Sequence, residues 1–206
     1  TDATATGALA DVTLGPPIPR PQNSMAIGLN YQKHADEGGM ELPENPMVFT
    51  KFPSCIVGPT ADVEMRGDMV DYEAELVVVI GTEGKDIPLD DAMSHVAGYT
   101  IGQDISDRPA QFMAQPAHFA LGKSFDTFGP LGPWVVSLDQ FTDPADLAIR
   151  CTVAGEVRQD DRTSNLIFDV PYLVHFLSHI VTLSPGDLIW TGTPEGIGFA
   201  QGKCLE

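Results

Sequence analysis

The sequence predicts a folded domain that is built mostly from β-strands and has few helices. The clearest strand covers residues 70–81, where Asp71, Glu73 and Glu75 alternate with Tyr72, Ala74 and Leu76 before an apolar run that glycine closes. Short β-prone runs recur along the chain, whereas only one segment has strong helical periodicity. With 206 residues, 43% of them hydrophobic, the chain is long and apolar enough for one well-buried domain.

The elements follow in chain order. Residues 1–23 are small, polar and proline-rich, which is typical of a linker or N-terminal arm, and residues 24–206 are expected to form the domain. Short strands are expected at 47–51, 54–57, 63–65, 98–106, 134–138, 149–154 and 188–190. Helical turns are expected just before Gly38 and Gly39 and at 89–95, and a hairpin turn at 155–161. The best helix is expected at 168–183, with Leu173, Phe176, Leu177 and Ile180 at core spacing.

The formal net charge of −18 excludes several classes of partner. Nucleic acids and anionic membrane surfaces are polyanions that such a surface repels, so neither is expected as a partner. A small anionic substrate would need a local cation, which favours a bound metal. The three cysteines form no paired pattern, and we see no secretory signal or membrane-spanning run, so a cytoplasmic protein is expected.

Three carboxylates are candidates for holding that metal. Glu73 and Glu75 are two apart on one strand, so their side chains share a face and stand roughly 7 Å apart. Asp104 ends the next predicted strand. Carboxylates this close repel one another unless a cation such as Mg²⁺, Mn²⁺ or Ca²⁺ lies between them. The alternatives are a half-exposed strand whose acidic side faces water, and an aspartate that opens a turn.

Two further groups are candidates for chemistry. His34 and Glu37 are three apart on the first helical turn and share a side, ahead of a proline-punctuated segment that suits a mobile lid. Lys123 is framed by glycine and aromatic residues in a chain with only 11 basic residues. The alternatives are an ordinary surface pair for the first two and a packed stem with an exposed head for the lysine. The glycine-rich turn at 191–198 fits no nucleotide-binding pattern, yet its amides suit a small carboxylate.

Five pieces of the sequence, in this order, resemble the fumarylacetoacetate hydrolase family, and they span about residues 19–198. They are Gly28-Leu29-Asn30-Tyr31 with His34 and Glu37; Asp71-Tyr72-Glu73-Ala74-Glu75-Leu76; Gly98-Tyr99-Thr100 through Asp104-Ile105-Ser106 with Arg108; Gly122-Lys123-Ser124-Phe125-Asp126; and Pro185-Gly186-Asp187 with Thr191-Gly192-Thr193-Pro194-Glu195-Gly196. One such piece is weak evidence, whereas five in order are strong evidence.

The resemblance implies a mixed, mostly β fold, a rolled β-sandwich with a few short helices that assembles as a homodimer. It assigns Glu73, Glu75 and Asp104 to a divalent ion, Mg²⁺ or Mn²⁺ and in some cases Ca²⁺. It makes His34 and Glu37 an acid–base pair and gives Lys123 a charge-stabilising role beside them. The remaining residues that it places around the substrate are Arg108, Gln111 and Thr193.

The chain departs from the family pattern in two respects. Family cores continue past the Thr191 to Gly196 turn into further strands, so the domain is expected to be incomplete at its C-terminus. Leu29 stands where some relatives have arginine, which removes one contact to a substrate carboxylate.

The reaction that the resemblance implies starts from a small anionic 2-oxo acid. The ion acts as a Lewis acid that stabilises the enolate released when the neighbouring C–C bond breaks. Because both His34 and Glu37 are present to activate water, we expect hydrolysis of a β-diketo acid of the acylpyruvate or fumarylpyruvate type. Decarboxylation of oxaloacetate and isomerisation of 2-hydroxyhepta-2,4-diene-1,7-dioate are alternatives at the same site. The alternative from another class is a cation-binding scaffold without turnover.

Overall fold

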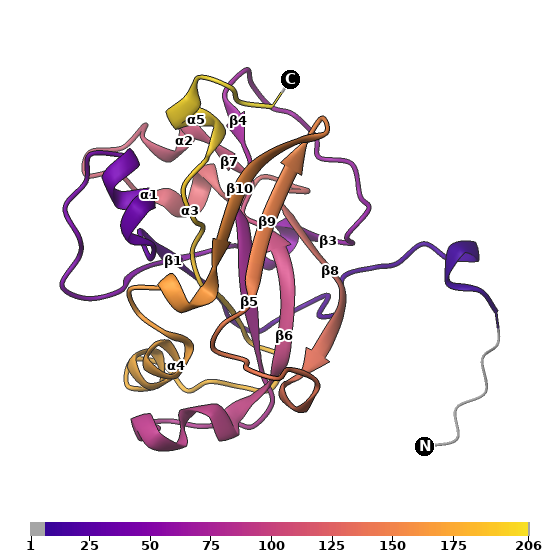
Figure 1. Cartoon of the computed structure of the whole chain (residues 1–206), viewed down its shortest axis with the longest axis vertical. Helices are drawn as coiled ribbons and strands as arrows, with labels where there is room; N and C mark the ends of the chain where they lie inside the picture. Colours follow the sequence, from indigo (N-terminus) through magenta and orange to yellow (C-terminus); the bar gives the residue numbers. More distant parts are fainter. Residues whose placement is uncertain (1–6, 206) are drawn as a thin grey trace.

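A seven-stranded sheet forms the centre of the molecule in a computed structural model that describes residues 7–205 (Figure 1). The strands run in the order β2-β1-β11-β5-β6-β8-β3. Their bounds are β1 (Ser24–Gly28), β2 (Met47–Thr50), β3 (Ile56–Val57), β5 (Ala74–Ile80), β6 (Val96–Gln103), β8 (Gly129–Ser137) and β11 (Leu188–Trp190). The predicted mostly β fold is confirmed.

Two small sheets and short helices complete the fold. The small sheets pair β9 (Ala148–Val153) with β10 (Glu156–Arg162), and β4 (Val70–Asp71) with β7 (Ser106–Asp107). The α-helices are α1 (Gln32–Glu37), α2 (Arg108–Gln111), α3 (Phe119–Gly122), α4 (Val170–Ser178) and α5 (Gly198–Gln201). The 3-10 helices are η1 (Leu9–Asp11), η2 (Pro53–Cys55), η3 (Leu89–His95), η4 (Leu138–Gln140) and η5 (Thr163–Asn165).

Strand β5 is buried along its whole length, which explains its unbroken apolar run. Its side chains alternate between two hydrophobic clusters, one on each face of the sheet. Leu76 and Val78 belong to the cluster that includes Leu173 of α4. Val77 belongs to the other cluster, which is built around Trp190. The central sheet therefore has a core on both sides.

The predicted strand at 70–81 is divided rather than continuous. Residues 70–71 pair with β7 in a small sheet, whereas residues 74–80 pair with β6 in the central sheet. The neighbouring segment that pairs with it changes sheets at the same level, between β6 and β7. There the amide of Asp104 donates to the carbonyl oxygen of Glu73 at 2.8 Å. The two strands thus step together from one sheet to the other, and carboxylates occupy the step.

Three other predictions of local structure are wrong. Residues 63–65 form no strand. Residues 155–161 are mainly strand β10, because the turn of this hairpin is confined to Ala154 and Gly155. The helix predicted at 168–183 is shorter, since Asp169 caps its start by accepting the amide of Tyr172 at 2.9 Å and the helix ends at residue 178. Ile180 therefore lies beyond the helix and is 62% exposed.

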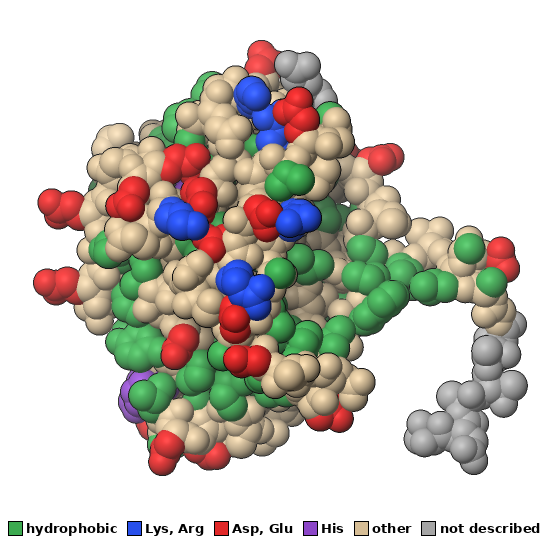
Figure 2. All heavy atoms as spheres, in the orientation of Figure 1, with side chains coloured by type: hydrophobic (Ala, Val, Ile, Leu, Met, Phe, Trp, Pro, Cys, Tyr) green, Lys and Arg blue, Asp and Glu red, His purple; other side chains and the backbone are tan. Residues whose placement is uncertain are grey.

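Helix η1 lies away from the sheet in Figure 1 and has no buried side chain, whereas Ile18, closer to β1, packs against the core. The expectation that residues 1–23 are an arm or linker stays a prediction, and residues 1–6 lie outside the described part. Acidic side chains are scattered over the face shown in Figure 2, as the net charge requires. Among the described residues, no helix has the length and apolar character needed to cross a membrane.

Helix α4 offers a direct test of the core. Leu173→Ala should lower the free energy of unfolding by about 2–5 kcal/mol, because it opens a cavity in the core where Leu173 is 0% exposed. The matched change Ile180→Ala should cost less than about 0.5 kcal/mol, because Ile180 is mostly exposed. Urea denaturation of both variants measures these values, and equal losses would contradict the observed end of α4.

Candidate active site

Glu73, Glu75 and Asp104 meet where the paired strands step between sheets. One carboxylate oxygen from each residue lies within 4.8 Å of the others. All three residues are buried, at 5%, 1% and 0% exposure. The alternative of an acidic strand face turned to water is therefore wrong, and the three predicted metal ligands do converge.

The pKa values of Glu73 and Glu75 are shifted in opposite directions. Burial, reinforced by Asp104 and Glu73, raises the pKa of Glu75 well above its usual value. Burial also acts to raise the pKa of Glu73, but the charges of Lys123 and Arg108 overcome it and lower that pKa to about 2. Glu75 accepts the amide of Gly192 at 3.0 Å. Of these two, Glu75 is the carboxylate that gains more from an added cation.

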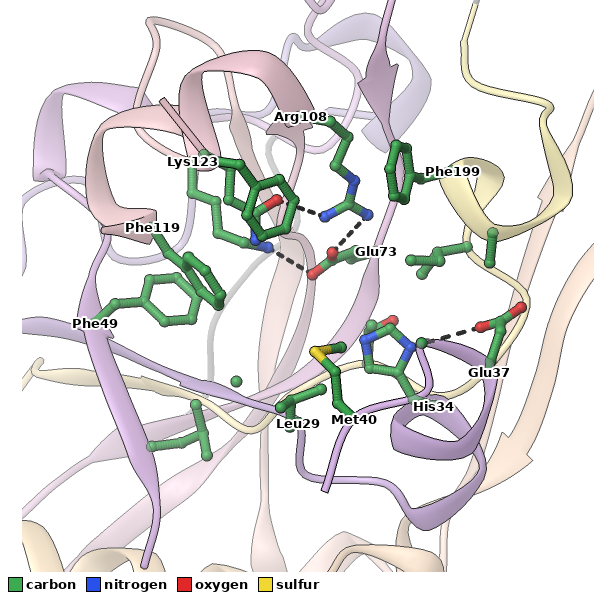
Figure 3. A pocket seen from close by; sticks show the side chains of 18 of the residues that line it. Leu29, His34, Glu37, Met40, Phe49, Glu73, Arg108, Phe119, Lys123 and Phe199 are labelled. Carbon is green, nitrogen blue, oxygen red and sulfur yellow. Dashed lines mark hydrogen bonds and ion pairs between the residues drawn. The ribbon is translucent and has the colours of Figure 1, made fainter. Parts of the chain in front are cut away.

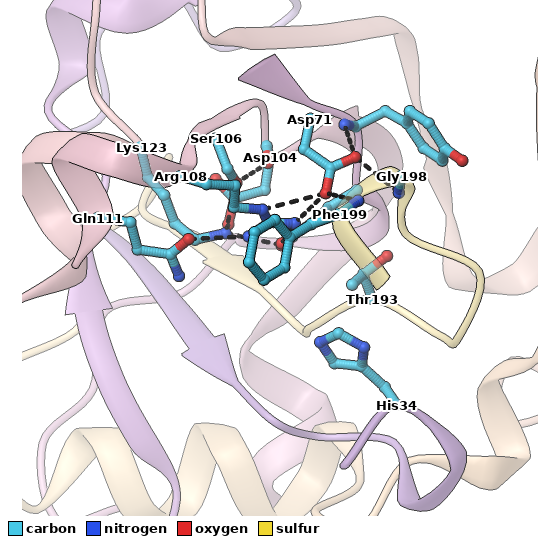
Figure 4. A network of polar contacts seen from close by, with 12 residues as sticks. His34, Asp71, Asp104, Ser106, Arg108, Gln111, Lys123, Thr193, Gly198 and Phe199 are labelled. Atoms are coloured by element: carbon cyan, nitrogen blue, oxygen red, sulfur yellow. Dashed lines mark hydrogen bonds and ion pairs between the residues drawn. The ribbon is translucent and has the colours of Figure 1, made fainter. Parts of the chain in front are cut away.

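Two buried cations lie against the carboxylates (Figure 4). Lys123 Nζ is 2.7 Å from Glu73 Oε2 and 2.7 Å from Asp104 Oδ2, so its charged head is buried rather than exposed. Arg108 binds Asp71 Oδ2 through Nε at 3.0 Å and reaches Glu73 Oε1 through Nη2 at 2.8 Å. Burial favours neutral Lys123, yet Asp104 and Glu73 raise its pKa above the ordinary value. Both side chains are thereby held as cations.

Lys51 is a third buried cation, and the sequence interpretation missed it. Its side chain is 0% exposed, and Nζ donates to Asp104 Oδ1 at 2.6 Å and to the carbonyl oxygen of Phe128 at 3.0 Å. The ammonium group also lies 5.4 Å from the centre of the Trp190 ring. Lys51 fixes one oxygen of Asp104, and so directs the other toward Lys123 and the carboxylate cluster.

The charges of this network do not balance. Four buried carboxylates, those of Asp71, Glu73, Glu75 and Asp104, face three buried cations. One negative charge is left over, and after burial itself the nearby carboxylates of Asp104 and Glu73 are what raise the pKa of Glu75. Oxygen ligands of this kind suit a hard divalent ion. The donor set and the missing positive charge therefore fit Mg²⁺, Mn²⁺ or Ca²⁺.

His34 and Glu37 lie on α1 and line the same pocket as the carboxylates (Figure 3). His34 Nδ1 is 3.6 Å from Glu37 Oε2, slightly beyond hydrogen-bond distance, and it is buried without a hydrogen-bond partner among the described residues. Glu37 instead accepts the amide of Gly196, at 3.1 Å to Oε2. The pair thus faces the pocket and is attached to the glycine-rich turn.

That turn binds carboxylates of the protein itself. The amide of Gly192 donates to Glu75, and the amide of Gly196 donates to Glu37. The expectation that the amides of this turn bind a small carboxylate ligand is therefore wrong for these two amides. Both glycines have positive φ, 96° and 98°, and a side chain at either would strike the neighbouring backbone. The hydroxyl of Thr193 donates to the carbonyl oxygen of Ala74 at 2.9 Å. The turn is therefore part of the framework of the site.

The pocket has a volume of about 300 Å³ and joins all nine predicted site residues except Asp104, which lies beneath its floor. Gln111 and Thr193 line it, although Gln111 uses its amide oxygen to accept from Arg108 Nη1 at 2.8 Å. The pocket also has an aromatic wall that the sequence interpretation missed, formed by Phe49, Phe112, Phe119 and Phe199. These residues come from four separate segments, so no local pattern signals the wall.

The chain matches a known protein family over most of its length. The profile described as fumarylacetoacetate (FAA) hydrolase C-terminal matches residues 23–206. The chain belongs to the fumarylacetoacetate hydrolase family. A curated human protein named oxaloacetate tautomerase FAHD2A, mitochondrial, is 44% identical over 191 residues, which cover 92% of this chain and 61% of that protein. The chain spans 61–63% of the length of the first curated relatives that it matches.

Solved structures of this family share the fold. The X-ray structure of 5-carboxymethyl-2-hydroxymuconate delta-isomerase from Mycobacterium smegmatis is 43% identical, with a TM-score of 0.82 over 94% of this chain and 76% of that one. The fumarylpyruvate hydrolase from Pseudomonas aeruginosa, solved with Mn²⁺ and pyruvate, is 33% identical, with a TM-score of 0.81 over 90% of this chain and 81% of that one. The family to which the chain belongs thus includes proteins named as tautomerases, isomerases and hydrolases.

Glu75 provides a test of the metal site. Mn²⁺ at about 100 times its Kd should stabilise the wild-type protein by about 2.7 kcal/mol, and Glu75→Gln should abolish this gain. Because the folded protein holds the Glu75 proton more tightly than the unfolded chain, wild-type stability falls as pH rises above the usual carboxyl range. Metal-free Glu75→Gln has no such loss, so its stability relative to wild type should increase with pH.

Thermal and urea denaturation with and without Mn²⁺ measure both effects. Glu83→Gln is the matched control, because Glu83 is exposed. Full Mn²⁺ stabilisation of Glu75→Gln would contradict the assignment of Glu75 as a ligand.

Lys51 is tested by removal of its charge. Lys51→Met should lower the free energy of unfolding in metal-free buffer by about 3–5 kcal/mol, because it leaves the buried Asp104 carboxylate without its partner. Lys85→Met, at an exposed lysine, should change it by less than about 0.5 kcal/mol. Urea denaturation compares the two, and a neutral Lys51→Met would show that Asp104 does not depend on this ion pair.

Proposed function

We propose that this protein is a divalent-metal-dependent hydrolase that cleaves a C–C bond of a β-diketo acid of the acylpyruvate type. The observation that carries the proposal is that an acid–base pair and a cluster of buried carboxylates line one pocket, with His34 and Glu37 on one side and Glu73 and Glu75 on the other. A structural cation site has no need of such a pair. The scaffold alternative is therefore less well supported.

The metal ligands would be Glu73, Glu75 and Asp104, and the ion Mg²⁺ or Mn²⁺, with Ca²⁺ as a further option. When bound, the ion would supply Lewis-acid polarisation of the keto group of the substrate. The chain's own residues would do the rest. Lys123 supplies a fixed positive charge beside the position where negative charge develops on oxygen. The free amide NH₂ of Gln111 and the edge of the Arg108 guanidinium would orient the substrate carboxylate.

Hydrolysis requires a nucleophilic water molecule. His34, oriented by Glu37, would accept a proton from water as the oxygen attacks the distal carbonyl carbon. The C–C bond between this carbon and the pyruvyl methylene then breaks, and its electron pair stays with the pyruvyl fragment as an enolate. Protonation of the methylene carbon gives pyruvate, and the acyl fragment leaves as a carboxylic acid. The reaction consumes one water and needs no oxidant or reductant.

A second candidate is keto–enol tautomerisation of oxaloacetate. It is favoured by the human relative of that name, at 44% identity. This reaction moves a proton between carbon and oxygen and needs no water, so His34 would act on the substrate itself. Oxaloacetate decarboxylation and isomerisation of an unsaturated dicarboxylate would use the same groups. The homodimer that the family resemblance implies is part of the same proposal.

The test is a turnover assay with acetylpyruvate, fumarylpyruvate and oxaloacetate side by side, with Mg²⁺ or Mn²⁺ present. Loss of acylpyruvate absorbance should exceed oxaloacetate turnover, and chelation of the metal should stop both. His34→Ala should reduce acylpyruvate hydrolysis by about 10²-fold or more, since general base catalysis contributes that much. Some oxaloacetate decarboxylation should remain, because that reaction uses no water.

His179→Ala is the control, because His179 is exposed and directly follows the C-terminal end of α4. Equal loss of both activities in His34→Ala would refute water activation by His34. Turnover of oxaloacetate alone would replace the hydrolase with the tautomerase or decarboxylase, and full activity after chelation would end the metal mechanism.

A further inference from the structure

Charged and apolar side chains both line the pocket, and Figure 3 shows Glu73 with Phe119 on one side and Phe199 on the other; we call the two sets of lining residues the charged end and the apolar end. The charged end contains the carboxylates with Lys123 and Arg108. The apolar end is lined by Leu29, Met40, Phe49, Phe112, Phe119 and Phe199. The two ends are in direct contact, since Lys123 Nζ lies 5.3 Å from the Phe49 ring centre and the Arg108 guanidinium carbon lies 5.8 Å from that of Phe199. A ligand bound at the charged end therefore has aromatic rings directly beside it.

The aromatic rings form a connected surface rather than isolated contacts. Phe119 packs edge-on against Phe49 and against Phe112, with ring centres 5.8 Å apart in both pairs. Phe112 also lies 6.5 Å from Phe199. A wall of this kind stabilises an apolar tail by removing its surface from water and offers a carboxylate no hydrogen-bond donor.

The cations that line the pocket already have partners. Lys123 binds Glu73 and Asp104, and Arg108 binds Asp71 and Glu73. No other lysine or arginine lines the pocket within the described part of the chain. A second carboxylate on the ligand would thus lie against the aromatic wall without a lysine or arginine as partner, in a pocket that the acidic side chain of Glu37 also lines.

The charge balance of the network points the same way. Four carboxylates and three cations leave one negative charge, and a divalent ion would convert this to one surplus positive charge. One ligand carboxylate neutralises that surplus. A second would restore an uncompensated negative charge in a buried site.

We propose that this site selects 2-oxo acids with an uncharged, apolar tail over 2-oxo acids that carry a second carboxylate. The inference rests on the proposed function, because it assumes that the charged end binds a 2-oxo acid. It narrows the β-diketo acid substrates to those with an alkyl or aryl acyl group, and disfavours fumarylpyruvate and oxaloacetate.

The test compares two stable ligands of nearly equal shape. 2-Oxoglutarate ends in a carboxylate, and 5-methyl-2-oxohexanoate replaces that carboxylate with an isopropyl group. Isothermal titration of the wild-type protein at saturating Mn²⁺ should give a Kd at least about tenfold lower for 5-methyl-2-oxohexanoate, because only its tail suits the aromatic wall. Binding is read directly, so the result does not depend on turnover.

Met40 allows a matched variant, because it lines the pocket and is 42% exposed, so a polar residue is tolerated there. Met40→Arg adds a cation to the apolar end and should reduce the preference for the apolar tail by about two- to fivefold. Met40→Gln is similar in length and uncharged, so it accounts for the loss of the apolar side chain, and it should reduce the preference less than Met40→Arg does.

The outcomes separate this inference from the proposed function. Equal or tighter binding of 2-oxoglutarate to the wild type would overturn the inference while leaving a 2-oxo acid site in place. An unchanged ratio in Met40→Arg would overturn the argument that missing positive charge sets the preference. If neither ligand binds with Mn²⁺ present, the proposed function fails and this inference fails with it.

Discussion

The constraint on which this structure depends is the burial of seven charged side chains in one network. Removing such charges from water is costly unless each finds a partner of opposite charge in good geometry. Here the partners come from segments far apart in the sequence: Lys51 follows β2, Arg108 begins α2 and Lys123 directly follows α3. Asp71 also accepts the amides of Gly198 and Phe199 at the start of α5. The charges therefore fix the positions of short helices that have little stability of their own.

The register of the paired strands at the step between the sheets explains why the carboxylates gather at one place. The backbones of Glu73 and Asp104 are hydrogen-bonded to each other at the level where both strands leave the central sheet. A regular strand pair would direct alternate side chains to opposite faces all along its length. Glu73 and Glu75 are two apart on one strand, and Asp104 continues the register opposite Glu73, so the three side chains share one face and converge, while the strand beyond them stays buried on both faces.

Much of this arrangement was predictable from local pattern. The run at 70–81 signalled a buried strand with acidic residues at its start, and the spacing of His34 and Glu37 placed both on one side of a short helix. The parts that were missed depend on contacts distant in sequence. Lys51 is an ordinary lysine after a short strand until its burial against Asp104, 53 residues away, is known. Ile180 fits the helical period, but the helix ends two residues before it.

The turn at 191–196 shows how one local feature couples the two halves of the site. Its first glycine holds Glu75 of the carboxylate cluster and its last holds Glu37 of the acid–base pair, and Tyr72 donates to the carbonyl oxygen of Gly196 at 3.0 Å. The sequence interpretation assigned these amides to a ligand because free amides attract carboxylates. The amides of this turn instead donate to two carboxylates of the protein itself. The backbone of residues 192–196 therefore links Glu75 of the carboxylate cluster to Glu37 of the acid–base pair.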